Sequence, residues 1–500
     1  MKRPVPLPVL PSRATIAPEA KEKCGVIAVW NPPKGMNAVR LTYLGMYAQQ
    51  HRGQESAGIV VTDGRTMAGH TGMGLVPAVF DEYALDQLDQ AVGHHGRAAI
   101  GHNRYSTAGG SQACNAQPLL ENYIGGQVAL AHNGNLINAD PLRYKFEEAG
   151  HLFHTTSDTE VIIHLLASPA QQKAPDPLAA TLRRLQGAFS LCFLFPDRIE
   201  AARDPWGWRP LVLGRLPGST APGEGWVVAS ETVALTVMGA SLVREIEPGE
   251  IVRIDAAGVH SRRFAEPAER LAHCVFEHVY FANPASSVFG QNVQSARERM
   301  GEMLAKEAPV AADCIMPMPD SGRSAATGYA RASGIPYREG IVPNRYVGRT
   351  FIKPTQTERA MAVRLKLNVI PDIVAGRRIV VVDDSIVRGT TTKAKMDQLR
   401  QAGAKEIHLR ISCPPIRHPC YFGVDFATRD QLIANGRTVE EIRAFLGVDS
   451  LHYLSLDGLL ACVDREPRSY CTACFSGDYR LDPDHPQTEI VVDSQQATMF

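Results

Sequence analysis

Hydrophobic and polar positions alternate in two different ways along this chain, and the change of pattern divides it into two regions. Between about residues 24 and 260, short apolar runs such as GVIAVW and GAFSLCFLF are separated by Gly and Asn turns, which is typical of strands in layered sheets. A stretch from about Ala38 to Gln50 has the spacing of an amphipathic helix. The first region is therefore predicted to be a sheet-rich α+β domain.

From about residue 290, each apolar run is followed by a loop and then by a helical pattern. The runs are ADCIMPMP at 312–319, RRIVVVDD at 377–384 and KEIHLRISCPP at 405–415. Strand–loop–helix units in series predict an α/β domain with a parallel, doubly wound sheet. We expect the boundary between these two domains to lie between about residues 255 and 290. The predicted divisions are a head at 1–23, domains at 24–260 and 261–480, and a tail at 481–500.

The composition argues against some classes of function but does not identify one. The 500 residues contain 52 Lys+Arg and 52 Asp+Glu, so charge gives no reason to expect nucleic acid or a membrane surface as a partner. No run approaches the roughly 20 apolar residues of a membrane helix. Prolines at 6, 8 and 11 interrupt the short apolar run of the head, which argues against a signal peptide. We therefore expect a cytoplasmic protein, in which ten cysteines indicate catalysis, metal binding or burial.

The strongest chemical signal is RRIVVVDDSIVRGTTT at 377–392. A buried strand would carry Asp383 and Asp384 to the carboxyl edge of the sheet, where ligands bind in such folds. Two adjacent buried carboxylates need partners such as ribose hydroxyls or a Mg²⁺-bound sugar. Ser385–Thr391 would offer N–H groups and hydroxyls to a phosphate at a helix N-terminus, with Gly389 permitting close approach. The simpler alternative is an ordinary strand that ends in a capped turn.

This string resembles the site that binds 5-phosphoribosyl-1-pyrophosphate (PRPP) in phosphoribosyltransferases. MPDSGRSAATGYA at 318–330 and NRYVGRTFI at 344–352 are similar to the amidophosphoribosyltransferase family, and the resemblance extends from Cys24 to about residue 480. It implies a pyrophosphate-side loop at PDSG and a mobile flap at NRYVGRTF, whose basic residues would meet pyrophosphate. A solvated basic loop is the alternative for the flap.

The resemblance also assigns individual residues on the PRPP side. Those assigned to PRPP are Asp320, Ser321, Arg345, Arg349, Lys353, Asp383, Asp384, Ser385, Arg388, Gly389, Thr390 and Thr391. Those assigned to one Mg²⁺ per subunit are Ser321, Asp383 and Asp384.

Cys24 lies directly before the first predicted strand. A thiol must become a thiolate to attack an amide, and the α-amino group of the same cysteine, with a pKa of about 7.7–8.0, is one available base. That route requires Cys24 to be the first residue of the mature chain, so that residues 1–23 would be a propeptide. Taken alone, Cys24 fits a small buried hydrophobic residue better than a nucleophile.

Four further strings resemble class II glutamine amidotransferases, whose nucleophile is an N-terminal cysteine in a layered αββα fold. They are HRGQESAG at 51–58, GHNRYSTAG at 101–109, HNGN at 132–135 and HTTSDTE at 154–160. The resemblance makes Cys24 the nucleophile and implies these roles: Asn133 and Gly134 as the oxyanion hole, Arg104 for the glutamine α-carboxylate and Asp158 for its α-ammonium. Taken singly, these residues also fit a loop Arg, an Asx-turn Asn and a helix-capping Asp. Lys23 is a departure, because members with a propeptide commonly have Glu before the cysteine.

The CTAC string at 471–474 is by itself compatible with metal binding, redox activity or chance. One branch of the family carries one structural [4Fe–4S] cluster per subunit, and its ligands would be Cys274, Cys420, Cys471 and Cys474. Four thiolates suit such a cluster or a zinc ion, and the resemblance favours the cluster. The cysteines predicted to be packing residues are Cys114, Cys192, Cys314, Cys413 and Cys462. In YFANPAS at 280–286, Asn283 and Ala285 replace an Arg and an Asp of many relatives.

Together these motifs predict an enzyme that moves ammonia from glutamine to PRPP, the first step of purine synthesis. The resemblance implies purine nucleotides as feedback inhibitors and a homotetramer. One alternative is another class II amidotransferase, acting on a sugar phosphate or aspartate, but such enzymes lack the DDSIVRGTT loop. Another is a PRPP-sensing regulator, which would not need Cys24, Arg104, Asn133 and Asp158 together.

Overall fold

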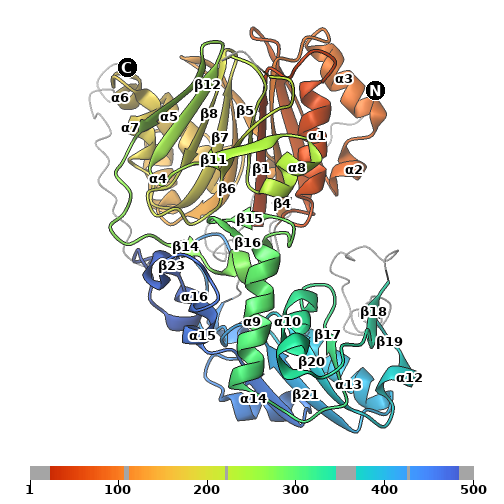
Figure 1. Cartoon of the computed structure of the whole chain (residues 1–500). Coiled ribbons are helices and arrows are strands. Elements are labelled where there is room, and N and C mark those ends of the chain that lie inside the picture. The colour runs from red at the N-terminus through yellow and green to blue at the C-terminus, as the bar shows by residue number, and fades with distance from the viewer. Residues whose placement is uncertain (1–22, 106–111, 220–222, 345–366, 425–427, 484–500) are drawn as a thin grey trace, which may run out of the picture.

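The computed structural model describes residues 23–105, 112–219, 223–344, 367–424 and 428–483, and it divides into an upper and a lower domain stacked on each other (Figure 1). The upper domain contains two large sheets, and the lower domain is built on a parallel sheet. Helix α9 (Val293–Glu307) begins at the junction and runs down into the lower domain. Among the described helices, none combines the length and the apolar character needed to cross a membrane.

The upper domain is a sandwich of two antiparallel sheets. One has the strand order β11 (Ser241–Glu245), β9 (Val212–Arg215), β10 (Trp226–Ala229), β1 (Lys23–Trp30), β4 (Ala98–Tyr105), β2 (Ser56–Thr62) and β3 (Met67–Met73). The other has the order β13 (Gly258–Arg263), β12 (Glu250–Asp255), β8 (Arg198–Arg203), β7 (Gly187–Phe195), β6 (Gly126–Leu136) and β5 (Leu119–Tyr123).

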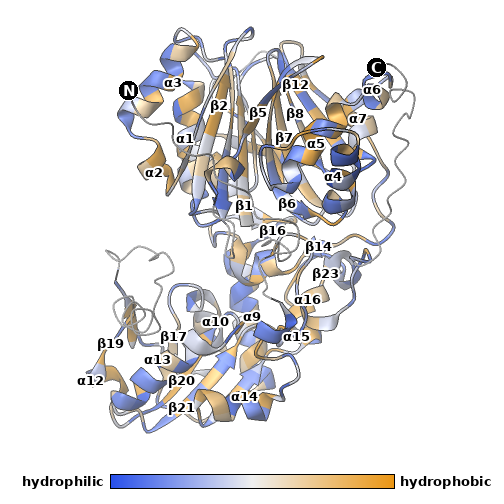
Figure 2. Cartoon of the chain, turned by 180° about the vertical axis from the view of Figure 1, so that it is seen from behind, coloured by the Kyte–Doolittle hydropathy of each residue, from blue (hydrophilic) through white to orange (hydrophobic). Residues whose placement is uncertain are grey.

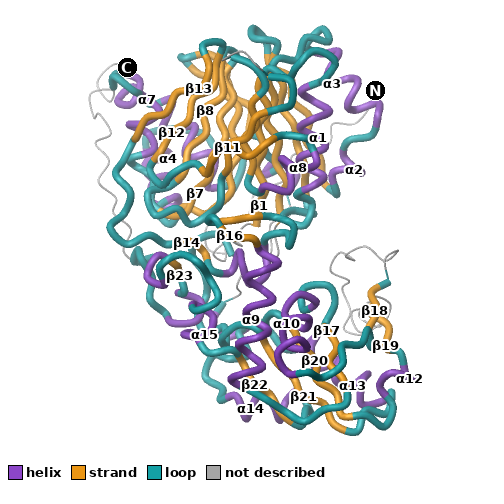
Figure 3. The backbone as a smooth tube through the Cα atoms, in the orientation of Figure 1, coloured by secondary structure: helices purple, strands orange, loops and turns teal. Residues whose placement is uncertain are grey.

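Helices cover both outer faces of the sandwich (Figure 3). Those of the first sheet are α1 (Ala38–Ala48), α2 (Val76–Val79), α3 (Glu82–Ala91) and α8 (Thr232–Val237). Those of the second are α4 (Ala139–Glu148), α5 (Asp158–Ala167), α6 (Pro169–Gln172) and α7 (Pro177–Leu182), and a short 3₁₀ turn, η2 (Ala113–Asn115), precedes β5. The predicted αββα layering is confirmed.

Strand β1 explains why the first apolar run is continuous. Val26, Ala28 and Trp30 pack between the two sheets. Ile27 and Val29 belong to the core under the helices of the first sheet. Successive side chains of a strand point to opposite faces, so a strand covered on both faces needs apolar residues at every position.

A linker joins the two domains and is contacted again by the end of the chain. It comprises β14 (His273–Cys274), the π-helical turn η3 (Glu277–Phe281), β15 (Ser287–Val288) and β16 (Gln291–Asn292). Strand β23 (Tyr470–Cys471) pairs in parallel with β14 and brings Cys471 beside Cys274. The 3₁₀ turn η5 (Pro467–Ser469) and helix α16 (Ala473–Ser476) flank β23.

The lower domain contains a four-stranded parallel sheet, as the strand–loop–helix pattern predicts. Its order is β17 (Cys314–Pro317), β20 (Arg378–Asp383), β21 (Glu406–Ile411) and β22 (Ser450–Tyr453), and the hydrophobic colour of β20 and β21 is visible in Figure 2. The remaining elements are α10 (Arg323–Ser333), the hairpin β18 (Ile341–Pro343) and β19 (Leu367–Val369), α12 (Pro371–Val374), α13 (Thr390–Gln401), η4 (Arg429–Gln431), α14 (Val439–Leu446) and α15 (Leu456–Leu460).

Candidate active sites and the cavity between them

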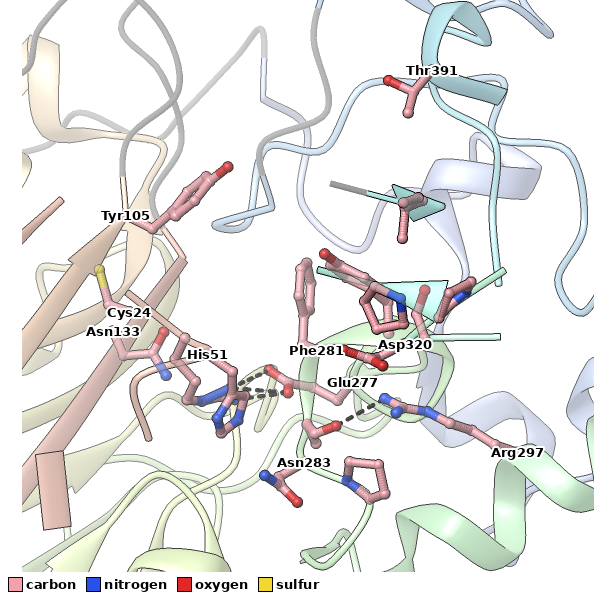
Figure 4. A pocket seen from close by; sticks show the side chains of 18 of the residues that line it. Cys24, His51, Tyr105, Asn133, Glu277, Phe281, Asn283, Arg297, Asp320 and Thr391 are labelled. Atoms are coloured by element: carbon pink, nitrogen blue, oxygen red, sulfur yellow. Dashed lines mark hydrogen bonds and ion pairs between the residues drawn. The ribbon is translucent and has the colours of Figure 1, made fainter. Parts of the chain in front are cut away.

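The candidate nucleophile lies at the end of a buried strand, facing the second sheet. Cys24 is the second residue of β1 and is only 2% exposed. Asn133 lies on β6, in the other sheet, with its side-chain amide 3.5 Å from the Ser230 hydroxyl. Both Cys24 and Asn133 line one cavity, and Figure 4 shows them side by side. The sandwich thus brings together a thiol and an amide donor that are more than a hundred residues apart in the chain.

Gly134 occupies a position where no side chain fits. A Cβ atom there would lie 2.0 Å from the carbonyl oxygen of Ala188 and 2.8 Å from Nε2 of His132. Because a side chain is excluded, the backbone beside Asn133 stays close-packed between β6 and β7. The Gly134 N–H, which is predicted to be part of the oxyanion hole, belongs to this close-packed backbone.

Arg104 is held by Glu55, which lies in the HRGQESAG string but was assigned no role from the sequence. Arg104 is the register partner of Cys24 across the β1–β4 pair. Its guanidinium Nη1 donates to Glu55 Oε1 at 3.0 Å, and both side chains are buried. The pair fixes the direction of the guanidinium, and a guanidinium held in this way is suited to a substrate carboxylate.

Asp158 is the first residue of α5, where a carboxylate interacts favourably with the helix dipole. Its Oδ2 accepts the Leu136 N–H at 2.9 Å, and its Oδ1 lies 3.6 Å from His132 Nδ1. Burial alone would raise the pKa of Asp158, but the charge of His132 and these hydrogen bonds outweigh it and lower the pKa. The carboxylate is therefore ionised at neutral pH and suited to an ammonium group. Arg104, Gly134 and Asp158 are not among the described residues that line the cavity.

On the lower domain, two loops meet at the carboxyl edge of the parallel sheet. β17 and β20 are neighbours, with Pro317 opposite Val382, so the loop beginning at Pro319 lies beside the one beginning at Asp384. Asp320 and Ser321 line the cavity. Burial, together with the adjacent charge of Asp384, raises the pKa of the Asp383 carboxyl well above its usual value. Two adjacent carboxylates repel each other when both are ionised, and a bound cation or hydroxyl donors would reduce this repulsion.

Helix α13 begins directly after this loop. Its N-cap is Gly389, which has φ of +75° and a neighbouring Ile433 side chain that would lie 2.4 Å from any Cβ. Ser385 is half-buried, and Arg388, Thr390 and Thr391 are exposed. The first N–H groups of a helix have no acceptor within it, and with the helix dipole they favour an anion there. Thr391 lines the cavity, so this anion-binding end faces the same space as Asp320.

The basic residues of the predicted flap, Arg345, Arg349 and Lys353, lie outside the described residues. The positions that flank this segment, Asn344 and Leu367, both line the cavity.

One cavity of about 850 Å³ joins the two candidate sites. Cys24 and Asn133 are at one end and Asp320 and Thr391 at the other, with Phe281 between them (Figure 4). The walls therefore come from both domains and from the linker.

A buried network of charges forms the middle of this cavity, and the sequence did not predict it. Glu277 accepts from Arg52 at 2.7 Å and from Arg209 at 3.1 Å. Arg52 also lies 3.1 Å from Glu231, which in turn is 2.7 Å from His51. Burial alone would raise the pKa of Glu231, but the charges of His51 and Arg52 lower it to about 2. The HRGQ motif pointed to His51 and Arg52, whereas no motif pointed to Glu277.

The departure at Asn283 is accommodated within this network. The Asn283 N–H donates to Glu231 Oε2 at 2.8 Å, and its side-chain Oδ1 accepts the Ala285 N–H at 2.9 Å. Arg297 supports the same segment from α9 by donating to the carbonyls of His278 and Ala282 at 2.7 and 2.8 Å. At Asn283 and Ala285, where many relatives have an Arg and an Asp, this chain therefore forms a local turn.

The four cysteines predicted as cluster ligands lie near one another at the junction. Burial, together with the neighbouring thiols of Cys420, Cys471 and Cys274, raises the pKa of Cys474 well above its usual value. The Phe422 N–H donates to Cys420 Sγ at 3.3 Å. Within the described ranges, no three His, Cys, Asp or Glu side chains are arranged to hold a metal ion.

The prediction that the other cysteines are packing residues is wrong for one of them. Cys192, Cys314, Cys413 and Cys462 are buried, but Cys114 is exposed. Cys114 lies in the short turn η2, where no core is available to cover it.

Comparisons with known proteins agree with this architecture. A family described as glutamine amidotransferase domain matches residues 102–237. The chain is 48% identical over 464 residues to the amidophosphoribosyltransferase of Methanothermobacter thermautotrophicus, covering 92% of this chain and 95% of that one. It is 45% identical over 463 residues to the Bacillus subtilis enzyme of the same name, covering 92% and 94%.

Solved structures give the same result. The glutamine PRPP amidotransferase of Bacillus subtilis in complex with ADP and GMP superimposes with a TM-score of 0.83 at 43% identity, covering 92% of this chain and 98% of that one. Identity and coverage at this level, over both domains of the molecule, establish common descent of the whole chain. The chain therefore belongs to the amidophosphoribosyltransferase family.

Proposed function

We propose that this protein transfers the amide nitrogen of glutamine to PRPP, giving phosphoribosylamine, glutamate and pyrophosphate in purine synthesis. The observation that carries the proposal is the single cavity with Cys24 and Asn133 at one end and Asp320, Ser321 and Thr391 at the other. A thiol beside an amide donor suits amide cleavage. An acidic pair followed by a helix N-terminus suits a phosphorylated sugar.

In the first half-reaction, the Cys24 thiolate attacks the glutamine carboxamide carbon. The Asn133 side chain and the Gly134 N–H stabilise the oxyanion, while Arg104 and Asp158 hold the α-carboxylate and the α-ammonium of glutamine. The C–N bond breaks, the departing NH₂ group takes the proton that the Cys24 thiol gave up and leaves as neutral ammonia, and a thioester remains on Cys24. Water then hydrolyses the thioester to glutamate and restores the thiol.

In the second half-reaction, ammonia attacks the anomeric carbon of PRPP as the bond to pyrophosphate breaks. Asp383 and Asp384 would hold the ribose hydroxyls, the residues from Ser385 to Thr391 the 5-phosphate, and Asp320 and Ser321 the pyrophosphate side. Arg345, Arg349 and Lys353 would add charge to the leaving group. One Mg²⁺ per subunit, held by Ser321, Asp383 and Asp384, would neutralise the pyrophosphate when bound.

The first test separates the two half-reactions. Cys24→Ser should lose glutamine-dependent activity by at least about a thousandfold, since a serine hydroxyl lacks thiolate reactivity. It should still release pyrophosphate from PRPP when ammonium at alkaline pH replaces glutamine. Wild-type protein that makes glutamate yet never consumes PRPP would contradict the proposal.

We also propose that Cys24 becomes the N-terminal residue by removal of residues 1–23. Support comes from the chemistry, since the freed α-amino group would serve as the base. Mass spectrometry of the purified chain should give the mass of residues 24–500. Full-length protein with complete glutaminase activity would rule the propeptide out.

A [4Fe–4S] cluster on Cys274, Cys420, Cys471 and Cys474 is the further proposal for the junction. Its support is the mutual proximity of four buried or half-buried thiols and the N–H···S hydrogen bond to Cys420, a kind of contact that tunes such clusters. Anaerobically purified protein should contain about four irons and four sulfides per chain, and Cys474→Ser should lose them and unfold at lower temperature. Zinc in place of iron, or intact stability without metal, would contradict it.

The proposal also covers inhibition of the enzyme by purine nucleotides and its oligomeric state. A solved relative in complex with ADP and GMP supports purine nucleotides as inhibitors. A homotetramer rests on the family resemblance, and a cytoplasmic location rests on the sequence. Sedimentation tests the homotetramer, and PRPP-dependent glutamate release measured with and without AMP or GMP tests the inhibition.

A further inference from the structure

Arg297 is a buried arginine that lines the cavity and is not paired with a carboxylate. Among the described residues that line the cavity there are three buried arginines, and two of them, Arg52 and Arg209, each form an ion pair with a glutamate. The guanidinium of Arg297 has only neutral acceptors in the described part of the chain, the His278 and Ala282 carbonyls. A buried positive charge without a negative partner is unfavourable, so the burial of Arg297 points to an anionic ligand.

One nitrogen of this guanidinium is available to such a ligand. Nε donates to one carbonyl and Nη2 to the other, which fixes the plane of the group and leaves Nη1 with no acceptor among the described residues. Figure 4 shows the side chain of Arg297 reaching from α9 to the linker, on the side of the cavity where Asp320 lies. A guanidinium presents its N–H groups as a rigid, planar fork, which suits the oxygens of a phosphate.

The packing of α9 against α10 places Arg297 on the pyrophosphate side of the PRPP end. One turn before it, Gln294 accepts the Ser324 hydroxyl at 2.6 Å. One turn after it, Gly301 is so close to α10 that a Cβ atom would lie 1.9 Å from the Ala325 carbonyl oxygen. Residues three and four apart share one face of a helix. Arg297 therefore lies on the face of α9 that contacts α10, and α10 begins directly after the PDSG loop.

The charges around Arg297 also relate it to the ribose site. Burial lowers the pKa of Arg297, and the carboxylate that most opposes this effect is Asp384. Arginine stays protonated in proteins, so its charge is permanent. A ligand whose ribose meets Asp384 and whose pyrophosphate meets the PDSG loop would bring that pyrophosphate next to Arg297.

We infer that Arg297 is a further binding residue for the pyrophosphate group of PRPP, to which its Nη1 group donates from the linker side of the cavity. The inference rests on the proposed function, because it takes PRPP as the ligand of this cavity. It adds a charge held by α9 to those that Arg345, Arg349 and Lys353 would supply. When the bond to the anomeric carbon breaks, its electron pair moves to pyrophosphate, and a fixed positive charge stabilises that leaving group.

A purely structural role is the alternative, because Arg297 also ties α9 to the linker through two carbonyls. In that case its loss leaves two buried acceptors without donors, and every ligand of the PRPP end would bind more weakly. A binding role predicts a selective loss, confined to ligands that contain pyrophosphate. Lysine separates the two roles as well, since it keeps the charge but lacks the planar fork that bonds both carbonyls.

The test compares Arg297→Met, Arg297→Lys and Arg299→Met in the otherwise complete protein. Arg299 is a matched control, because it is on the same helix but partly exposed and paired with Asp464 at 2.8 Å. Calorimetric titration measures the binding of PRPP, pyrophosphate and ribose 5-phosphate, each with Mg²⁺. Arg297→Met should bind PRPP and pyrophosphate about tenfold to a hundredfold more weakly, the usual cost of a lost hydrogen bond to a charged group, and ribose 5-phosphate as well as the wild type does. Arg297→Lys should recover part of the loss, and Arg299→Met should match the wild type.

Equal pyrophosphate binding by Arg297→Met and the wild type would overturn the inference. So would an equal loss of all three ligands that lysine does not reduce, which is the structural outcome. If Arg297→Met does not fold, Arg297→Gln takes its place, since its amide can still donate to one of the carbonyls. Failure of the wild type to bind either PRPP or pyrophosphate would instead refute the proposed function, and the inference with it.

Discussion

Single residues in this molecule act through neighbours that fix their direction, and Arg104 is the clearest case. Its guanidinium is buried beside Cys24 in the strand register and is held by Glu55 at 3.0 Å. A buried arginine without a carboxylate is strongly unfavourable. Glu55 therefore both permits the burial and fixes the direction in which the guanidinium points.

Replacing Glu55 by Gln should raise KM for glutamine, because the guanidinium loses the charge that aligns it. A lost charge-assisted hydrogen bond of about 1.5–3 kcal/mol corresponds to about a tenfold to hundredfold lower kcat/KM. Steady-state glutamate release measures this, and ammonium-dependent pyrophosphate release should be unchanged. Glu82→Gln serves as the control, since Glu82 pairs with Arg40 on the surface. A wild-type KM in Glu55→Gln would show that Arg104 needs no such support.

The residues that could be predicted from the sequence differ in kind from those that could not. Cys24, Asp383 and Gly389 occur in contiguous strings whose chemistry can be read locally. Glu277 acquires its role from Arg52 and Arg209, which lie 225 and 68 positions away.

At the scale of elements, apolar runs predicted the strands because β1, β7 and β20 are covered on both faces. The order of the strands was not predictable, since β1 pairs with β10 from residues 226–229. Helix α1 ends at Ala48, two residues before the expected end. The π-helical η3 was missed because five residues are too few to show a period.

The start of helix α8 shows how elements are joined by charge. Its N-cap, Glu231, accepts the Asn283 N–H at 2.8 Å and the Ser286 hydroxyl at 2.7 Å, and it pairs with His51 and Arg52. Two separate segments, 51–52 and 283–286, therefore converge on one carboxylate at the start of α8. Protonating it would weaken all of these contacts at once.

Glu231 should make the free energy of unfolding depend on pH between about pH 4.5 and pH 2. Its folded-state pKa of about 2 lies below the ordinary 4.5, so its contribution is full above pH 4.5 and is lost as the pH falls toward 2. The shift corresponds to a contribution on the order of 3 kcal/mol. Urea denaturation should show Glu231→Gln less stable than the wild type at pH 7, with a difference that shrinks between pH 5 and pH 3. A difference independent of pH would mean that Glu231 stabilises by shape rather than by charge.

For the whole molecule, the decisive feature is that the cavity belongs to neither domain alone. Its walls include Cys24 from the sandwich, Phe281 from the linker and Thr391 from the lower domain (Figure 4). Ammonia is a good nucleophile only while unprotonated, and bulk water at pH 7 would convert it to ammonium. A cavity that runs from the thiol to the sugar phosphate would let ammonia cross without that exchange.

The last prediction follows from this path. With amide-¹⁵N glutamine, PRPP and a tenfold excess of unlabelled ammonium at pH 7, most of the product should carry ¹⁵N, as read by mass spectrometry. Phe281→Ala should widen the middle of the cavity and lower the ¹⁵N fraction, whereas Tyr83→Ala, at a side chain 72% exposed on α3, should not. Product labelled in proportion to the bulk nitrogen pool would mean that ammonia leaves the protein between the two reactions. The cavity would then be only a cleft between two independent sites, and the charges buried in its middle would need another explanation.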